Sequence, residues 1–307
     1  MSSRIDFDKP VLNINEKIEL LKERGLIFND EENEKSDLQH IWYFRLTWYF
    51  KFFQNKENNL FLKWTTFKQV LDLYIFDRKL RLLTLDAVEK IEVSLKANIN
   101  DYISEKHWIY WYLDESLFSL EKIENKEIYK KFKKNIVKNI QTKEKAIFVK
   151  EFFKKYDEKF LPSWMLFEEL TIWSVSTLFN ILKSDYCRKI SENYNVYYVD
   201  LRKWLNLIVQ IRNISAHYSR LWNNNYKVRP RIQDTVFKEF YLTESNLNQK
   251  EVISNYYNFS LITYYLLKKI NKNLNWLEDL DKLFLEFPSV PKIKMWFDSN
   301  WKENFTQ

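Results

Sequence analysis

The chain of 307 residues has little of four residue types: it contains one glycine, one cysteine, three histidines and five prolines. A single glycine cannot build the glycine-rich loop that binds phosphates in many nucleotide sites. The lone Cys187 excludes an intramolecular disulfide, and His40, His107 and His217 lack the spacing of metal ligands. We therefore expect neither a metal nor another cofactor.

The scarcity of glycine and proline also bears on the fold, because folds with many tight turns need both residues. Apolar residues recur at spacings of three and four over long stretches, without sustained alternation. This pattern predicts an all-α protein. We expect an N-terminal helical region over residues 1–106 and a second region, 107–307, packed with it as one unit.

A signal peptide and a membrane-spanning run are also missing. The most apolar stretch, residues 161–182, is interrupted by Glu168 and Glu169, and what remains is too short to cross a bilayer. Together with the low cysteine content, this predicts a cytoplasmic protein with no membrane partner.

The charged residues are in contrast abundant and unbalanced. The net charge is +7 and the pI is about 9.0, which favours a polyanionic partner. Lysines are concentrated between residues 122 and 159, where aromatic and aliphatic residues interleave with them. Either this stretch is a track for an RNA backbone or it is a solvated helix face. Its central lysines are Lys130, Lys131, Lys133, Lys134, Lys138, Lys143, Lys145 and Lys150.

The most informative motif is the segment 210–223, QIRNISAHYSRLWN, which ends an apolar helix expected from about Asp200. RNA carries its own nucleophile, the 2′-hydroxyl, so cleavage needs only a proton carrier and a cation. His217 suits proton transfer near neutral pH, and the Arg212 guanidinium can bind two phosphate oxygens at once. Asn213 can orient the imidazole or the phosphate by a hydrogen bond. These three residues are the candidate catalytic group.

The spacing of this group leaves its geometry open. On an ideal helix Arg212 and His217 are about 140° apart, whereas Asn213, His217 and Arg220 share one stripe. Either the arginine side chain curls round, or the helix distorts near His217, or a second copy completes the site. The alternative to an active site is a helix C-terminus that His217 and Arg220 stabilise by their charge.

The motif resembles two known patterns. Arg212 and His217, with four residues between them, resemble the RxxxxH signature of the HEPN superfamily, whose members are mostly small helical ribonucleases. The wider string RNxxAHxxRLWN resembles the abortive-infection (Abi) family of phage-defence proteins, in its AbiD/AbiF-like branch. The resemblance implies a HEPN-type helical bundle with additional N- and C-terminal helices. It also implies sites built between two paired units, and hence a possible homodimer.

Two blocks near the N-terminus carry the same resemblance. The first is LLKERGLI at residues 20–27, followed by Tyr43 and Arg45. Asn13 and Glu16 form a predicted capping box for its helix, and Gly25 is the predicted stop. We interpret Tyr43 and Arg45 either as a core aromatic residue and a surface ion pair or as RNA contacts.

The second block, residues 66–92, contains FDRKLRLL and predicts one long amphipathic helix. Its predicted apolar stripe comprises Leu80, Leu83, Ala87, Ile91, Leu95 and Ile99, and its predicted polar face comprises Arg78, Arg81, Glu89 and Glu92. Either glutamate, Glu89 or Glu92, is a candidate for orienting Arg212 or His217 from behind the site.

Two later blocks complete the resemblance. LPSWMLFEEL, residues 161–170, predicts a helix start at Pro162 and Ser163, with Trp164, Phe167, Leu170 and Thr171 on the core side. The segment MWFDSNW, residues 295–301, departs from the family's MGFPxxW because tryptophan replaces the glycine and aspartate the proline. The turn at that place is therefore in doubt.

The resemblance and the residue chemistry lead to one functional hypothesis and one alternative. The first is a metal-independent endoribonuclease toxin of phage defence, restrained by a small non-coding antitoxin RNA. The alternative is an RNA-binding or interaction protein on a HEPN scaffold that does not cut. The residues predicted to contact RNA are Arg220, Lys130, Lys131, Lys133, Lys134, Arg45 and Arg78.

Overall fold

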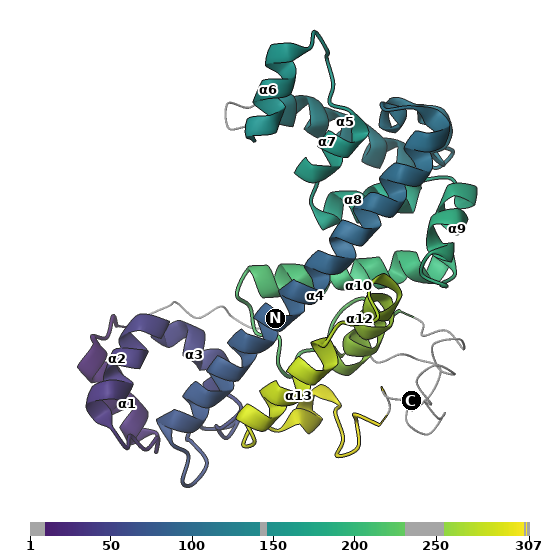
Figure 1. Cartoon of the computed structure of the whole chain (residues 1–307). Helices are drawn as coiled ribbons and strands as arrows, with labels where there is room; N and C mark the ends of the chain where they lie inside the picture. The colour runs from purple at the N-terminus through teal and green to yellow at the C-terminus, as the bar shows by residue number, and fades with distance from the viewer. Residues whose placement is uncertain (1–9, 142–145, 231–254, 304, 306–307) are drawn as a thin grey trace, which may run out of the picture. The chain divides into compact units, whose positions relative to one another are not determined.

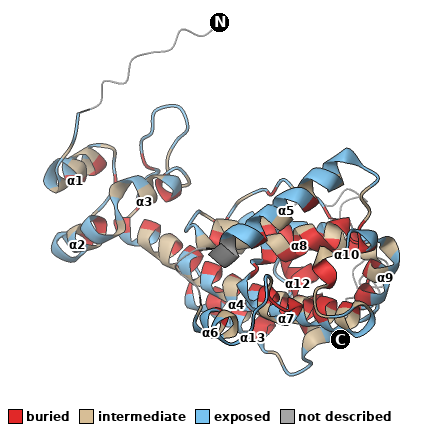
Figure 2. Ribbon diagram, turned by 90° about the horizontal axis from the view of Figure 1, so that it is seen from above, coloured by how far each residue is buried: buried red, intermediate tan, exposed pale blue. Residues whose placement is uncertain are grey.

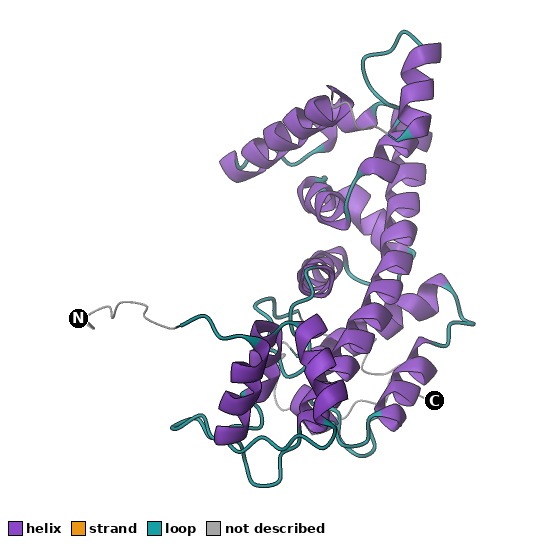
Figure 3. Ribbon diagram, turned by 90° about the vertical axis from the view of Figure 1, so that its left-hand side faces the viewer, coloured by secondary structure: helices purple, strands orange, loops and turns teal. Residues whose placement is uncertain are grey.

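The computed structural model describes residues 10–141, 146–230, 255–303 and 305. These residues form α-helices joined by loops and short 3-10 turns, and they contain no β-sheet, which confirms the all-α prediction (Figures 1 and 3). The helices are α1 (Ile14–Glu23), α2 (Glu31–Ile41), α3 (Tyr43–Phe50), α4 (Phe67–His107), α5 (Ile123–Gln141), α6 (Ile147–Lys155), α7 (Ser163–Glu169), α8 (Ile172–Ile181), α9 (Ser184–Glu192), α10 (Tyr198–Ala216), α12 (Tyr256–Ile270) and α13 (Trp276–Glu286).

The chain divides into two compact units. The first contains residues 1–80 and 281–291, and the second contains residues 81–280 and 292–307. The division falls within α4 and within α13, so both helices contribute residues to both units. The predicted boundary after residue 106 lies one residue before the end of α4 at His107, and the predicted division of the chain stays a prediction.

The first unit begins with a helix whose ends are both determined locally. Asn13 and Glu16 form the predicted capping box, in which each backbone N–H donates to the other side chain. At the other end Gly25 takes a φ of 88°, and its N–H donates to the carbonyl of Lys22. The N–H of Leu26 reaches back to Leu21, which completes a Schellman motif. Both predictions for α1 are confirmed.

A buried hydrogen bond and an aromatic cluster hold the first unit together. The Tyr49 hydroxyl on α3 donates to the Asp77 carboxylate on α4 over 2.6 Å. Phe76 packs against Phe284 and Phe287 with ring centroids 5.9 and 6.0 Å apart. The first half of α4 is therefore fixed by both polar and apolar contacts.

The second half of α4 lies in the second unit and buries the predicted stripe at Ala87, Ile91, Leu95 and Ile99. The prediction for Arg81 was wrong, because this residue is 4% exposed instead of lying on the polar face. It shares a buried side of the helix with Asp77, Thr84 and Val88, at spacings of three, four and seven. Because three of these four residues are polar or charged, hydrophobic periodicity did not reveal the stripe.

The core of the second unit lies around α8, α10 and α12, where Figure 2 shows the buried residues gathered. Helix α10 packs against α8, α9 and α12. On one side Trp204 meets the ring of Tyr265 edge to face at 5.8 Å. The helix that carries the candidate catalytic group is thus buried along most of its length.

The block that begins at Leu161 corrects one prediction. Helix α7 starts at Ser163 as predicted, and Phe167 and Leu170 are buried. Trp164, however, is 49% exposed, and Thr171 is exposed as well. Within α7 the buried side consists of Ser163, Leu166 and Phe167, which leaves Trp164 outside it. Thr171 is exposed because the chain becomes extended at Leu170, so helical periodicity does not continue from α7 into α8.

The turn near the C-terminus is present despite the tryptophan that replaces the family's glycine. Trp296 adopts a φ of 74°, the left-handed conformation that glycine usually supplies. Its N–H donates to Ile293, and that of Phe297 donates to Lys292. Phe297 then packs against Tyr257 and Trp301. The doubt about this turn was therefore misplaced.

None of the helices in the described ranges is long and apolar enough to cross a membrane.

Candidate active site

His217 stands at the point where α10 stops. It is the C-cap residue, with φ −89° and ψ 14°, and Ala216 is the last helical residue. The N–H of Tyr218 donates to Ser215 over 3.1 Å, and that of Ser219 donates to Ile214 over 3.0 Å. This pair of bonds is a Schellman motif, with Tyr218 in the left-handed position at φ 58°. The backbone around His217 is therefore fixed.

The segment after the turn is anchored in the core. Leu221 and Trp222 are both fully buried, so the chain passes inward directly after the exposed turn. The Arg81 guanidinium, from α4, donates to the carbonyl oxygen of Ser219 over 3.4 Å. The turn that carries His217 is thus held from both sides.

The imidazole of His217 is exposed and has no hydrogen-bond partner within the described residues. Arg212 is half-buried, and its guanidinium lies 3.4 Å from the side-chain oxygen of the adjacent Asn213. It forms no ion pair with a carboxylate in the part of the chain that the structure describes. A free proton carrier and an uncompensated cation therefore occur five residues apart.

The structure bears on the three geometries that the spacing left open. Because α10 ends at Ala216, Arg220 lies beyond it and does not continue a helical stripe through Asn213 and His217, so that expectation was wrong. Arg220 is half-buried, and its carbonyl accepts from Asn224. The backbone N–H of His217 donates to the Asn213 carbonyl over 3.0 Å, but within these described residues its imidazole forms no hydrogen bond with the side chain of Arg212 or Asn213.

The glutamates predicted to support the site lie on α4. Glu92 pairs with Lys96 of the same helix, with nitrogen and oxygen 2.9 Å apart. Glu89 is exposed. Neither carboxylate is hydrogen-bonded to Arg212 or His217 in the described ranges, so their supporting role stays a prediction.

The lysine-rich stretch forms an amphipathic helix. Tyr129, Phe132 and Ile136 form the buried side of α5, and the lysines occupy the opposite side. Two of them are paired: Lys130 with Glu127 at 2.8 Å and Lys133 with Glu115 at 2.6 Å.

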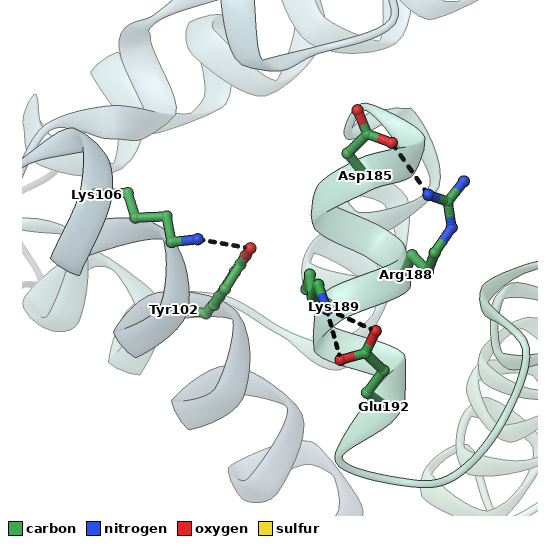
Figure 4. Close-up of polar contacts among 6 residues, drawn as sticks. All are labelled: Tyr102, Lys106, Asp185, Arg188, Lys189 and Glu192. Carbon is green, nitrogen blue, oxygen red and sulfur yellow. Dashed lines mark hydrogen bonds and ion pairs between the residues drawn. The ribbon is translucent and has the colours of Figure 1, made fainter.

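Two other lysines of α5, Lys131 and Lys134, are exposed and have no acidic partner among the residues described. By contrast, Arg188 and Lys189 of α9 are matched by Asp185 and Glu192 of the same helix (Figure 4). The free positive charge of α5 is therefore the better candidate for phosphate contacts. Lys143 and Lys145 lie outside the described residues.

The remaining predicted RNA contacts belong to the first unit. Arg45 is half-buried on α3, and Arg78 is exposed on the first half of α4. Their assignment to an RNA surface stays a prediction.

Two residues near His217 were missed by the sequence analysis. Arg81 was placed on the solvent side, although its spacing from the buried Asp77 and Thr84 could have indicated a shared face. Tyr218 was passed over because a left-handed backbone is not expected of tyrosine.

Other chemistries find no support in the described residues. Burial raises the pKa of the Cys187 thiol, and the guanidinium of Arg202, whose terminal nitrogen lies 3.1 Å from the sulfur, opposes this rise. The thiol is fully buried, so it is a poor nucleophile. No group of three His, Cys, Asp or Glu residues in the described ranges could hold a metal ion.

Comparison with known proteins gives one match. The family model described as Abi-like protein matches residues 36–223, a range that includes the whole of α4, the lysine-rich stretch and the motif with Arg212 and His217. No curated protein and no solved structure matches the chain significantly.

Proposed function

Since the chain belongs to the Abi-like protein family, which suggests involvement in abortive infection, we propose that it is a metal-independent endoribonuclease toxin. The observation that carries the proposal is the exposed His217 imidazole on a fixed turn, close in sequence to a guanidinium without an acidic partner. Such a pair offers a proton carrier and a phosphate-binding cation without any metal.

The proposed reaction uses the RNA's own nucleophile. His217 takes the proton of a 2′-hydroxyl, whose oxygen forms a bond to the adjacent phosphorus while the bond from phosphorus to the 5′-oxygen breaks. Arg212 binds the phosphate oxygens that gain charge, and Asn213 fixes the guanidinium through its side-chain oxygen. The departing 5′-oxygen receives a proton. The products are a 2′,3′-cyclic phosphate and a 5′-hydroxyl.

A second copy of the chain fits this reaction. While one imidazole holds the proton of the nucleophile, a second group has to donate a proton to the leaving 5′-oxygen. The His217 of a second protomer would be such a donor. We propose that a homodimer on a HEPN-type scaffold brings two sets of Arg212 and His217 together. We also propose that a small RNA binds the lysine side of α5, which includes Lys131 and Lys134, and restrains the toxin.

The test is a cleavage assay on single-stranded RNA with and without EDTA. The wild type should cut in the presence of EDTA and leave 2′,3′-cyclic ends. His217→Ala should lose on the order of 10²- to 10⁴-fold in rate, the usual contribution of a positioned acid or base. His40→Ala removes another exposed histidine and should cut at the wild-type rate. Equal rates for the His217 and His40 variants would refute the proposal.

The second candidate function is RNA binding without cleavage. It is favoured by one observation, that Arg212 reaches Asn213 and not His217 in a single copy of the chain. In that case the wild type and His217→Ala would bind RNA with equal affinity, and neither would cut it.

A further inference from the structure

Tyr218, directly after His217, combines an exposed ring with a left-handed backbone. Its φ is 58°, and 67% of the residue is exposed to solvent. A tyrosine disfavours this conformation, because its Cβ approaches the backbone, whereas a glycine adopts it freely. The fold therefore places a large, exposed aromatic side chain at a backbone position that glycine would adopt without strain.

The same motif ends α1, and there the chain uses its only glycine, Gly25. The turn by itself thus has no need of a side chain. Left-handed backbones with exposed aromatic rings also occur at Trp42, Trp64, Trp108 and Trp296, so conformation alone does not distinguish Tyr218. What distinguishes it is its place beside the candidate catalytic imidazole.

The backbone that carries the Tyr218 ring is held by hydrogen bonds. The Tyr218 and Ser219 N–H groups are both bonded back into α10, and the Ser219 carbonyl accepts from the buried Arg81. The next apolar residue, Leu221, is fully buried. An aromatic ring on a fixed backbone loses little conformational entropy on binding, which suits it to stack on another flat group.

We propose that Tyr218 is a positioning residue that stacks on an unpaired base of the RNA strand next to the phosphate that His217 acts on. The inference rests on the proposed function and specifies its substrate as single-stranded RNA. Bases in a duplex are stacked on each other and do not offer a free face, whereas single strands are regularly bound by aromatic side chains. Arg220, two residues further on, supplies a positive charge to the same segment.

Two variants test the proposal, each in the His217→Ala background so that the RNA stays intact. The probe is a single-stranded oligoribonucleotide that contains 2-aminopurine, a base whose fluorescence falls on stacking. Tyr218→Gly should weaken binding by on the order of ten- to a hundredfold, the range found for loss of a stacked base, and should abolish the quenching. Tyr218→Phe keeps a stacking ring and should bind and quench as before. A duplex of the same sequence should bind independently of residue 218.

Thermal unfolding separates this role from a structural one. Tyr218→Gly should unfold no lower than the parent by more than a few degrees, because glycine adopts the left-handed backbone freely, while its affinity for RNA falls. A larger fall of the unfolding temperature in that variant, or a Kd equal to that of the parent, would overturn the proposal.

Cleavage assays on chains that keep His217 distinguish failure of the stacking role of Tyr218 from failure of the proposed ribonuclease function. If Tyr218→Gly raises KM and His217→Ala removes cleavage, both the stacking role and the proposed function are supported. If His217→Ala removes cleavage but Tyr218→Gly leaves KM unchanged, only the stacking role fails. If the chain does not cut RNA at all and Tyr218→Gly still weakens binding, the stacking role stands and the nuclease fails.

Discussion

The guanidinium of Arg81 on α4 donates to the backbone carbonyl of Ser219, two residues after His217, across 138 positions of sequence. Arg81 is buried, so removal of this charged donor should lower the free energy of unfolding. The middle of the longest helix is thereby connected to the turn that carries the candidate catalytic residue. A change in α4 can in this way alter the site without touching it.

We expect Arg81→Met to destabilise the protein by about 1.5 to 3 kcal/mol, the usual contribution of a hydrogen bond to a charged group. It should also lower the cleavage rate, since the turn at His217 loses one support. Urea unfolding and a cleavage assay measure the two effects. Arg78→Met, three residues earlier on the same helix, removes an exposed side chain and should change stability by no more than about 0.5 kcal/mol. Equal stabilities for the two variants would contradict the assigned role.

Expression of the chain on its own should slow bacterial growth, whereas Arg212→Ala and His217→Ala should not. The physical reason is that removal of either the phosphate-binding cation or the proton carrier stops RNA cleavage. Growth curves after induction, at matched protein levels, provide the measurement. His40→Ala serves as the control and should be as toxic as the wild type. Growth arrest by all four proteins would show that toxicity does not depend on cutting.

The lysines of α5 give a matched pair of double variants. Lys131→Ala with Lys134→Ala removes two cations that lack acidic partners, and Lys130→Ala with Lys133→Ala removes two that are paired. Both lower the net charge by two. If α5 follows the RNA backbone, the first variant should flatten the dependence of log K on log salt by about 0.7 per lost phosphate contact, and the second should do so less. Slopes equal to that of the wild type in both cases would identify α5 as a solvated face.

Gly25→Ala should destabilise the first unit by roughly 1 to 2 kcal/mol, because an L-residue at a φ of 88° is strained. The effect is conformational and not steric, since an added Cβ would lie 3.9 Å from the nearest atom, the Phe61 carbonyl oxygen. Gly25→Asn should lose less stability, because asparagine tolerates the left-handed region. Denaturant unfolding of both variants checks the order.

The thiol of Cys187 should resist alkylation in the folded protein. Burial raises its pKa, so at neutral pH the reactive thiolate is rarer than in a free cysteine, and the sulfur is also inaccessible. Iodoacetamide should label the chain fully in urea and hardly at all in buffer. Rapid labelling of the native protein would mean that this part of the core opens easily.

Local signals in the sequence were sufficient for the parts of the fold that depend on neighbouring residues. The capping box at Asn13 and Glu16 and the stop at Gly25 each arise from contacts within five residues, and the predicted start of α7 follows Pro162 at its N-cap. The helix expected from about Asp200 begins at Tyr198. Backbone hydrogen bonds and steric preferences determine such features, and both can be inferred from residue types.

Features that depend on distant partners were not predictable in the same way. The buried Arg81 donates a hydrogen bond to a carbonyl 138 residues away, and no local pattern contains that information. The break at Leu170 separates α7 from α8, and no glycine or proline at that place indicates it in the sequence. For the site, the sequence indicated which residue types are present, whereas the end of α10 at Ala216, which decides the position of His217, required the structure.

The packing of α12 against α10 limits where the chain can be truncated. The family match ends at Asn223, but α12 lies beyond it, and its Tyr256 and Tyr265 are buried against α4 and α10. A chain cut after Asn223 would leave the apolar side of α10 around Trp204 without its partner Tyr265. The segment recognisable by sequence is therefore shorter than the segment that can fold, and expression of the matched range alone should yield aggregated protein.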